Sequence, residues 1–431
     1  MTEVSVDNNS LSGGFNPYEL NWDETVSFPS TRSLMEYGNK IYNRYPARSI
    51  FLVPRAIFYQ NHLKNKKLNI LDPYMGSGTT AVEASQFKFN IFGVEMDPFA
   101  RLISEVSIMR FNDIEKNELR KLLEKIKKNW KNHTINDDLY PDLKNVEYWF
   151  DDKIFKDLLR LKSYIYDTIT NENYLKFFKV TFADCIKPTS KMERQSTKPY
   201  ISSKYEKKIK PVIESFEYSF KKHLKALSQY EVDNEYNPKI NWIGNDASSF
   251  QSEETIDVAI TSPPYLNAFD YTQIIKVASS WVGTLTNPDI KELRSIQVGH
   301  HYRREVKFHN EAINAFKTFY DKLLSLDKDK TRSSPQKLAD TCLAYFNDIY
   351  SNLENVYRSL KKGGEYHMIL GDNTIKGIEI PTHKLIANLA QKTGFDWFGY
   401  YKYPIKDHRT SIPRNGKGGK IKYEYIISLR K

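Results

Sequence analysis

Two short motifs contain polar, glycine and proline residues in patterns typical of a ligand-binding or catalytic site. DPYMGSGTT begins at Asp72 and follows an apolar run at 68–71, and TSPPY ends at Tyr265 after the apolar run IDVAI. Each motif therefore follows a predicted buried strand. Ligands of open α/β sheets bind beyond the carboxyl ends of the strands, so both motifs stand where a site is expected.

The first motif differs from the phosphate-binding loops of nucleotide-binding proteins. A P-loop requires GxxxxGK[ST], and here Thr79 follows Gly78 with no lysine in the turn. A dinucleotide fingerprint requires three glycines, and only Gly76 and Gly78 are present. The carboxylate of Asp72 heads the turn, and it suits a cationic ligand better than a pyrophosphate.

Two further acids follow later strands. Glu95 follows a predicted strand at 89–94, where an acid accepts hydrogen bonds from ribose hydroxyls, and Asp246 follows the run INWIG. Asp246 could accept a hydrogen bond from an adenine amino group. S-adenosylmethionine offers a sulfonium, an ammonium, a ribose and an adenine to such a row of acids. Any one acid could instead cap a helix, but three in order favour a ligand site.

The double proline of TSPPY makes a rigid corner. Pro263 and Pro264 fix the local backbone and leave carbonyl oxygens without neighbouring N–H groups, while Ser262 adds a hydroxyl and Tyr265 a flat ring. Rigid acceptors beside an aromatic ring suit the exocyclic amino group of a base drawn out of its duplex. A turn with a packed tyrosine is the structural alternative.

Together the two motifs resemble those of the DNA amino-methyltransferases, which use S-adenosylmethionine to methylate N4 of cytosine or N6 of adenine. NRYPARSIFLVPRAI is similar to the N-terminal cofactor motif of that family. The cofactor-binding residues that the resemblance implies are Tyr45, Pro46, Ala47, Asp72, Gly76, Gly78, Thr79, Glu95 and Asp246. The catalytic residues that it implies are Ser262, Pro263, Pro264 and Tyr265. Serine at the first position of SPPY is more typical of cytosine-N4 enzymes.

The elements around these motifs predict an α/β fold. Strands at 68–71 and 89–94 are followed by helices that open near Thr79 or Thr80 and at Pro98. This alternation predicts a Rossmann-like methyltransferase sheet, mostly parallel, and the runs FDWFGYYKYPI and KIKYEYIISLRK predict an antiparallel C-terminal hairpin.

The predicted domain organisation has three parts. Residues 1–14 are expected to be a flexible tail, and residues 15–110 and 241–431 to form the catalytic domain. Residues 111–240 read as a large, mainly helical insertion, which we expect to serve in DNA recognition.

The charge of the chain favours a polyanionic partner. Its 431 residues carry a formal net charge of +11, which suits double-stranded DNA, although a solvated basic surface is the alternative. Basic stretches at 187–225, 298–307 and 408–422 are the candidate DNA contacts. The predicted contact residues are His301, Arg303, Arg409 and Arg414.

Other chemistries fit the sequence less well. Carbon-5 methylation of cytosine uses a cysteine that normally follows a proline, and neither Cys185 nor Cys342 does. No zinc-ligand pattern is present, and no metal is expected. Without a secretory signal or an apolar run long enough to cross a bilayer, the chain is expected to be cytoplasmic.

The sequence thus favours a site-specific DNA methyltransferase acting on cytosine N4, in a restriction-modification system with a cognate endonuclease for the same site. Methylation of adenine N6 by the same fold is the first alternative, and methylation of RNA is another. A non-catalytic nucleic-acid-binding module is the alternative of a different class, although binding alone would not require the acids and the SPPY corner.

Overall fold

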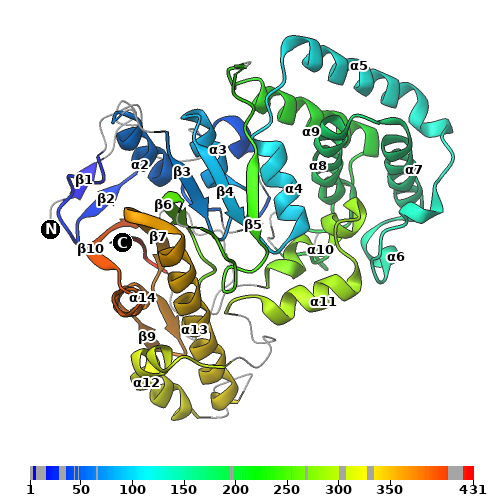
Figure 1. Ribbon diagram of the computed structural model, residues 1–431. Helices are drawn as coiled ribbons and strands as arrows, with labels where there is room; N and C mark the ends of the chain where they lie inside the picture. The colour runs from blue at the N-terminus through cyan, green and yellow to red at the C-terminus, as the bar shows by residue number, and fades with distance from the viewer. Residues whose placement is uncertain are drawn as a thin grey trace.

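A nine-stranded mixed sheet forms the centre of the computed structural model, with the strand order β1-β2-β10-β11-β7-β6-β3-β4-β5 (Figure 1). The structure describes residues 3–5, 16–28, 35–42, 44–46, 48–64, 67–194, 196, 198–204, 206–233, 235–253, 255–266, 270–299, 307–327, 334–405 and 421–431. The strands of the sheet are β1 (Glu3–Ser5), β2 (Thr25–Ser27), β3 (Asn69–Asp72), β4 (Asn90–Val94), β5 (Ile240–Gly244), β6 (Ile256–Thr261), β7 (Leu360–Gly371), β10 (Asp396–Pro404) and β11 (Tyr423–Arg430).

The strand directions confirm the predicted fold class. Strands β5, β4, β3, β6 and β7 are parallel neighbours, whereas β11 pairs antiparallel with both β7 and β10. The sheet is therefore mostly parallel and carries an antiparallel C-terminal hairpin, as the alternation of the sequence predicts. A separate two-stranded ribbon joins β8 (Asn373–Ile375) to β9 (Ile378–Ile380).

Helices cover both faces of the sheet. One apolar core joins the sheet to α2 and α3, and another joins it to α12, α13 and α14. The α-helices are α2 (Leu52–His62), α3 (Thr79–Gln86), α4 (Pro98–Ser107), α5 (Asp113–Asn129), α6 (Val146–Trp149), α7 (Asp152–Thr168), α8 (Glu172–Thr189), α9 (Val212–Leu227), α10 (Tyr271–Val282), α11 (Asn287–Ile296), α12 (Asn310–Leu324), α13 (Pro335–Ser359) and α14 (Thr382–Lys392). Short 3-10 turns are η2 (Tyr37–Lys40), η3 (Trp130–Asn132) and η4 (Asp137–Leu139).

Helix starts follow the capping signals of the sequence. Helix α3 begins at Thr79 and α4 at Pro98, both at predicted positions. Proline is favoured in the first turn because it has no N–H to satisfy there, and Asp97 caps α4 by accepting a hydrogen bond from the Phe99 N–H. No helix in the described ranges is both long enough and apolar enough to cross a membrane.

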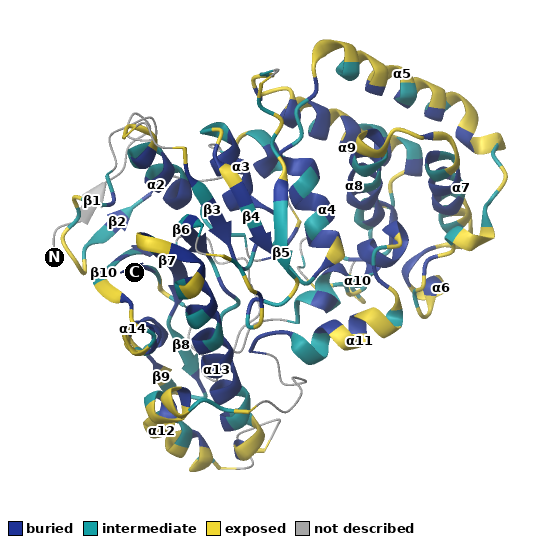
Figure 2. Ribbon diagram, viewed as in Figure 1, coloured by how far each residue is buried: buried dark blue, intermediate teal, exposed yellow. Residues whose placement is uncertain are grey.

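The helices between β4 and β5 form a helical lobe, which we define as α5 to α9. Helix α8 lies at its centre and contacts α4, α7, α9 and α10. Phe177 and Phe178 of α8 are fully buried, and both rings pack against Phe220 of α9. Figure 2 shows an exposed outer side on α5, whereas α4 and α8 are largely buried. The lobe therefore shares its core with α4, which follows β4, and with α10, which follows the SPPY corner.

A buried carboxylate ties this lobe to the N-terminal segment that carries Tyr45. Asp184 of α8 accepts a hydrogen bond from Nη1 of Arg44 at 3.1 Å and another from Lys222 of α9. His223 lies 3.4 Å from the same carboxylate. Burial alone would raise the pKa of Asp184, but Lys222, His223 and Arg44 outweigh it and hold that pKa well below its usual value.

Replacing this carboxylate should destabilise the fold. We expect Asp184→Ala to lower the free energy of unfolding at pH 7 by roughly 1–3 kcal/mol, because Lys222, Arg44 and the buried His223 lose a hydrogen-bonding partner while the two cations stay partly solvated. Since the folded pKa is depressed, this contribution is complete above the unfolded pKa of 3.8 and is lost as the pH falls below it.

Urea denaturation followed by circular dichroism measures the change. Lys221→Gln, at a side chain that is 68% exposed, is the control and should shift stability by less than about 0.5 kcal/mol. An unchanged Asp184→Ala midpoint would contradict the role of the cluster.

Candidate active site

The first predicted cofactor acid and the SPPY corner meet at neighbouring strand ends. Strands β3 and β6 pair in parallel, with Leu71 opposite Ala259. Asp72, the last residue of β3, accepts a hydrogen bond of 2.6 Å from the hydroxyl of Thr261, the last residue of β6. Ser262 follows directly, so the two motifs, 189 residues apart, are joined by one buried contact.

The environment of Asp72 disfavours its charged form. Burial raises the pKa of its carboxyl to about 6, against the hydrogen bonds from Thr261, Thr80 and the Tyr74 N–H, which favour the ionised state. The Tyr74 N–H bond is 3.0 Å long. A buried carboxyl held only by neutral donors is a natural partner for a cation that enters the site.

The turn after β3 is shaped by its contact with α4. Gly78 has a φ of +84°, and a Cβ at this position would lie 2.6 Å from the Cβ of Ser104. Only glycine combines the left-handed conformation with such a close approach. The sequence predicts this glycine near a ligand, and the structure gives it a packing reason as well.

Glu95 reaches back from the end of β4 to this turn. Its carboxylate accepts hydrogen bonds from the Gly76 N–H at 2.7 Å and from the Asp97 N–H at 2.9 Å. Burial raises the pKa of Glu95, partly opposed by these two bonds. Glu95 is therefore fixed beside the glycine turn, one strand away from Asp72.

Asp97 joins the acids of the site, although sequence reasoning missed it. Its Oδ1 caps α4, while its buried Oδ2 accepts no hydrogen bond within the described residues. Burial, and then the neighbouring Glu95, raise the pKa of Asp97 to about 8. The signal in the sequence was the Asp-Pro pair at the helix start, which reads first as a cap.

The N-terminal cofactor segment also lies against the turn. The side chains of Tyr45 and Pro46 are buried, and the ring of Tyr45 lies 3.5 Å from the place of a Cβ on Gly76. Burial raises the pKa of Tyr45, and Glu95 and Asp97 add to the increase. Ala47 lies outside the described residues.

The third predicted acid follows the next strand. Asp246 comes two residues after β5, which pairs with β4, and its carboxylate accepts hydrogen bonds from the N–H and hydroxyl of Ser248 at 2.8 and 2.7 Å. Asp72, Glu95 and Asp246 thus follow β3, β4 and β5 in sheet order. Because the carboxyl ends of parallel strands share one edge, the three acids form a row along it.

This row fits a ligand that is cationic at one end. Burial raises the pKa values of the carboxyl groups of Asp72, Glu95 and Asp97. Oδ2 of Asp97 also accepts no hydrogen bond from the described residues. A sulfonium or ammonium group would stabilise their ionised forms. S-adenosylmethionine, the cofactor that the resemblance implies, carries both groups.

The SPPY corner holds its tyrosine by the hydroxyl group. The Tyr265 hydroxyl donates a hydrogen bond to Glu424 of β11, and the Ser262 side chain acts on the Tyr265 phenol in the direction that lowers its pKa. Burial and the Glu424 charge raise the pKa of Tyr265. Pro263 is buried and Pro264 half-buried. Sequence reasoning missed Glu424, since nothing in KIKYEYII distinguishes it from a strand carboxylate facing solvent.

The predicted DNA contacts are placed only in part. His301, Arg303, Arg409 and Arg414 lie outside the described residues. Lys187 and Lys207 of the basic stretch 187–225 donate to backbone carbonyls, Lys207 to that of Ser190 at 2.8 Å. Burial lowers the pKa of Lys187 to about 8 and that of Lys207 to about 7, and neighbouring cations contribute. These two lysines therefore bind backbone carbonyl groups at the end of α8 and in the segment that follows it.

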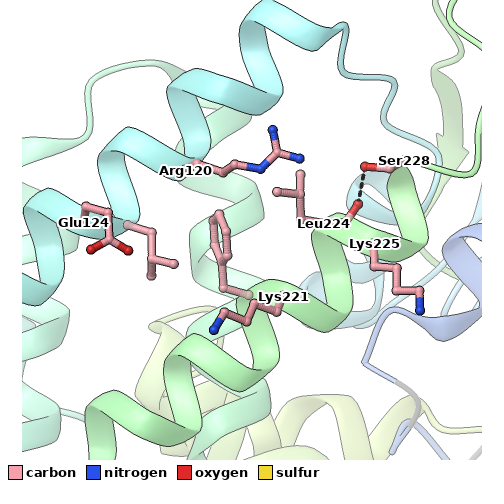
Figure 3. A pocket seen from close by; sticks show the side chains of 8 residues that line it. Arg120, Glu124, Lys221, Leu224, Lys225 and Ser228 are labelled. Atoms are coloured by element: carbon pink, nitrogen blue, oxygen red, sulfur yellow. Dashed lines mark hydrogen bonds between the residues drawn. The ribbon is translucent and has the colours of Figure 1, made fainter.

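A groove of about 490 Å³ lies between α5 and α9, and side chains of the two helices face one another across it (Figure 3). It is lined by Arg120, Leu123, Glu124, Phe220, Lys221, Leu224, Lys225 and Ser228. Lys221 and Lys225 belong to the basic stretch 187–225. None of the predicted cofactor or catalytic residues lines this groove, so it is separate from the row of acids.

Comparison with known proteins gives relatives of one class, the type II methyltransferases. The chain is 23% identical over 383 residues to the type II methyltransferase M.MvaI of Kocuria varians, a match that covers 81% of this chain and 80% of the relative. It is 22% identical over 410 residues to M.AvaI of Anabaena variabilis, with 86% and 81% covered. Over 106 residues, 25% of this chain and 19% of the relative, it is 30% identical to M.MjaII of Methanocaldococcus jannaschii. No family model matches the chain.

These similarities support the class predicted from the sequence, a site-specific DNA methyltransferase, and the target base stays a prediction. Among solved structures, the chain matches a DNA modification methylase of Thermus thermophilus complexed with S-adenosyl-L-methionine. The match has a TM-score of 0.19 and 20% identity, and covers 26% of this chain and 52% of that chain. The order and direction of the strands define the α/β fold of this chain.

The raised carboxyl pKa values lead to a pH prediction. Asp72 and Asp97 must ionise to attract a sulfonium, so the affinity for S-adenosylmethionine should increase about tenfold or more as the pH rises from below 6 to above 8. Isothermal titration calorimetry in buffers of different ionisation enthalpy should also detect proton release at pH 7. S-adenosylhomocysteine, which lacks the sulfonium charge, is the control and should show a weaker dependence. Equal pH dependence of the two ligands would contradict this assignment.

Proposed function

We propose that this protein is a site-specific DNA methyltransferase that transfers a methyl group from S-adenosylmethionine to N4 of cytosine in double-stranded DNA. We further propose that it is the modification enzyme of a restriction-modification system, with a cognate endonuclease that acts on the same site. The choice of cytosine N4 over adenine N6 rests on Ser262 at the first position of SPPY.

The observation that carries the proposal is the hydrogen bond between Asp72 and Thr261. It joins the strand that heads the predicted cofactor turn to the strand that ends in the SPPY corner. A reaction between two bound molecules requires adjacent sites, because holding the reactants together supplies much of the rate enhancement. The similarity to M.MvaI and M.AvaI along most of the chain supports the same class of activity.

Each group of residues has a distinct task in this proposal. S-adenosylmethionine, when bound, supplies an electrophilic methyl group carried on sulfur. Asp72 and Glu95 bind its charged and hydroxyl groups, and Asp246 accepts from its adenine. Ser262 and the carbonyls of the SPPY corner accept hydrogen bonds from the target amino group and orient its lone pair. Tyr265 stacks on the base once it has left the duplex.

The lobe of α5 to α9 is proposed to take part in DNA recognition. It shares its core with α4 and α10, the helices that follow Glu95 and the SPPY corner. Exposed cations of the lobe and the basic residues at 298–307 and 408–422 would neutralise phosphates. In this arrangement the protein reads its site with the lobe while the strand ends perform the transfer.

Analysis of the methylated product tests the proposed function. Incubation of the protein with S-adenosylmethionine and duplex DNA, followed by digestion to nucleosides and mass spectrometry, should give N4-methylcytosine. N6-methyladenine would reverse the base assignment, and methylation of RNA but not of duplex DNA would reverse the substrate. A protein that binds DNA without methylating any nucleic acid would be a binding module, and the proposal would fail.

Two variants serve as internal controls for this experiment. Asp72→Ala should abolish product by removing cofactor binding. Tyr265→Ala should keep cofactor binding and lose most of the product, because it removes the proposed base contact and leaves the acids proposed to bind the cofactor in place. An equal loss of cofactor affinity in both variants would contradict the division of roles.

A further inference from the structure

Glu424 is a carboxylate at the SPPY corner that the proposed function does not use. It lies on β11, opposite Gly371 of β7 and Tyr403 of β10. Both of its oxygens accept hydrogen bonds from tyrosine hydroxyls, Oε1 from Tyr265 and Oε2 from Tyr403. It is half-buried, and no cation is among the described groups that act on its pKa. A strand carboxylate is thus held at the target-base pocket by two neutral donors.

The contact between Tyr265 and Glu424 crosses one strand of the sheet. Strand β7 lies between β6 and β11 in the sheet, so Tyr265 must cross β7 to reach Glu424. The residue of β7 at the crossing is Gly371, and a Cβ there would lie 3.6 Å from Cε2 of Tyr265 and 2.7 Å from Cγ2 of Ile421. A Cβ at this position would be in ordinary van der Waals contact with the phenol and would collide with Ile421, so the close approach of Ile421 is what favours glycine here.

Hydroxyl groups lead from the corner to the carboxylate. The Ser262 side chain acts on the Tyr265 phenol and lowers its pKa, and the Tyr265 hydroxyl donates a hydrogen bond to Glu424. Each link can take a proton on one side and give one up on the other. Ser262 is also the residue that the proposed function places at the target amino group.

We propose that Ser262, Tyr265 and Glu424 form a proton relay that deprotonates the target amino group during methyl transfer, with Glu424 as the terminal acceptor. This inference rests on the proposed function. As the amino nitrogen forms its bond to the methyl carbon, the methyl–sulfur bond breaks and its electron pair stays on sulfur. One N–H bond breaks, and the proton passes to Ser262 as the serine proton moves to Tyr265 and the tyrosine proton to Glu424. Glu424 ends protonated and then releases the proton to solvent.

The electrostatics of the cluster support a proton acceptor. Burial raises the pKa of Glu424, and the hydrogen bond from Tyr265 opposes part of this increase. The net increase brings the pKa of Glu424 closer to the neutral range, where general bases work best. The facing titratable groups are Tyr265 after β6 and Tyr403 of β10, while Tyr271 of α10 interacts with Tyr265. Phe28 packs on the Tyr403 ring with centroids 5.2 Å apart.

A double-mutant cycle tests the relay. Glu424→Gln keeps the size of the side chain but cannot take up a proton. It should lower kcat by about 100-fold or more, within the usual range of general base catalysis, without changing the KM for S-adenosylmethionine or the affinity for DNA. Tyr265→Phe should lower kcat to the same extent, and the double variant should be no slower than either single variant. Tyr423→Phe, a neighbour on β11 with no assigned role, is the control and should match wild type.

The pH profile separates the relay from a structural role. In wild type the rate should fall as the pH drops through the raised pKa of Glu424, because a protonated Glu424 cannot accept. Glu424→Gln should lose this limb. In the protein without cofactor, subtracting the infrared spectrum of Glu424→Gln from that of wild type should isolate the carboxyl band of Glu424. This band should titrate above pH 4.5, the usual pKa of glutamate.

Several outcomes would overturn the relay. These are a Glu424→Gln variant with wild-type kcat, additive losses in the double variant, a fall in rate caused by lost cofactor binding, or a carboxyl band that titrates at or below 4.5. If Glu424→Gln does not fold, Tyr265→Phe with an unchanged acid limb overturns it in the same way. A wild-type protein that methylates no nucleic acid overturns the proposed function and the relay with it, whereas an active wild type with any of the results above overturns the relay alone.

Discussion

The parallel pairing of β3 with β6, closed by the hydrogen bond from Thr261 to Asp72, is the constraint on which the site depends. Each strand brings one motif to the same edge of the sheet, and the buried bond fixes their relative height. The acids after β4 and β5 lie along the same edge on one side of β3, and Glu424 of β11 lies on the opposite side, beyond β7. The geometry of the sheet thus sets the distance between the proposed cofactor and base sites.

The helical lobe is joined to this edge by shared packing. Helix α8 packs against both α4 and α10, and Asp184 of α8 holds Arg44, the residue before Tyr45. The segment that carries Tyr45, proposed to bind the cofactor, and the helices proposed to recognise DNA are therefore joined by shared packing and by the Arg44–Asp184 bond.

Much of the fold and part of the site could be predicted from the sequence, because the relevant signals are local. Apolar runs followed by acids indicated the strand ends, the glycine turn indicated a helix start near Thr79, and the first-turn proline indicated one at Pro98. Long-range contacts could not be predicted. Glu424 reaches Tyr265 across 159 residues, and the contact crosses a third strand, β7. Lys187 and Lys207 read as DNA contacts but bind carbonyls of their own segment, since their partners become visible only when that segment folds.

A crystal structure of the protein with a non-reactive S-adenosylmethionine analogue and duplex DNA would test the central claim most directly. We expect the sulfur end of the analogue to lie beside Asp72 and an everted base to point its amino group between Ser262 and that sulfur. The nitrogen should lie about 3–3.5 Å from the position of the transferred methyl carbon. A cofactor bound away from Asp72, or a target base held away from Ser262, would contradict it.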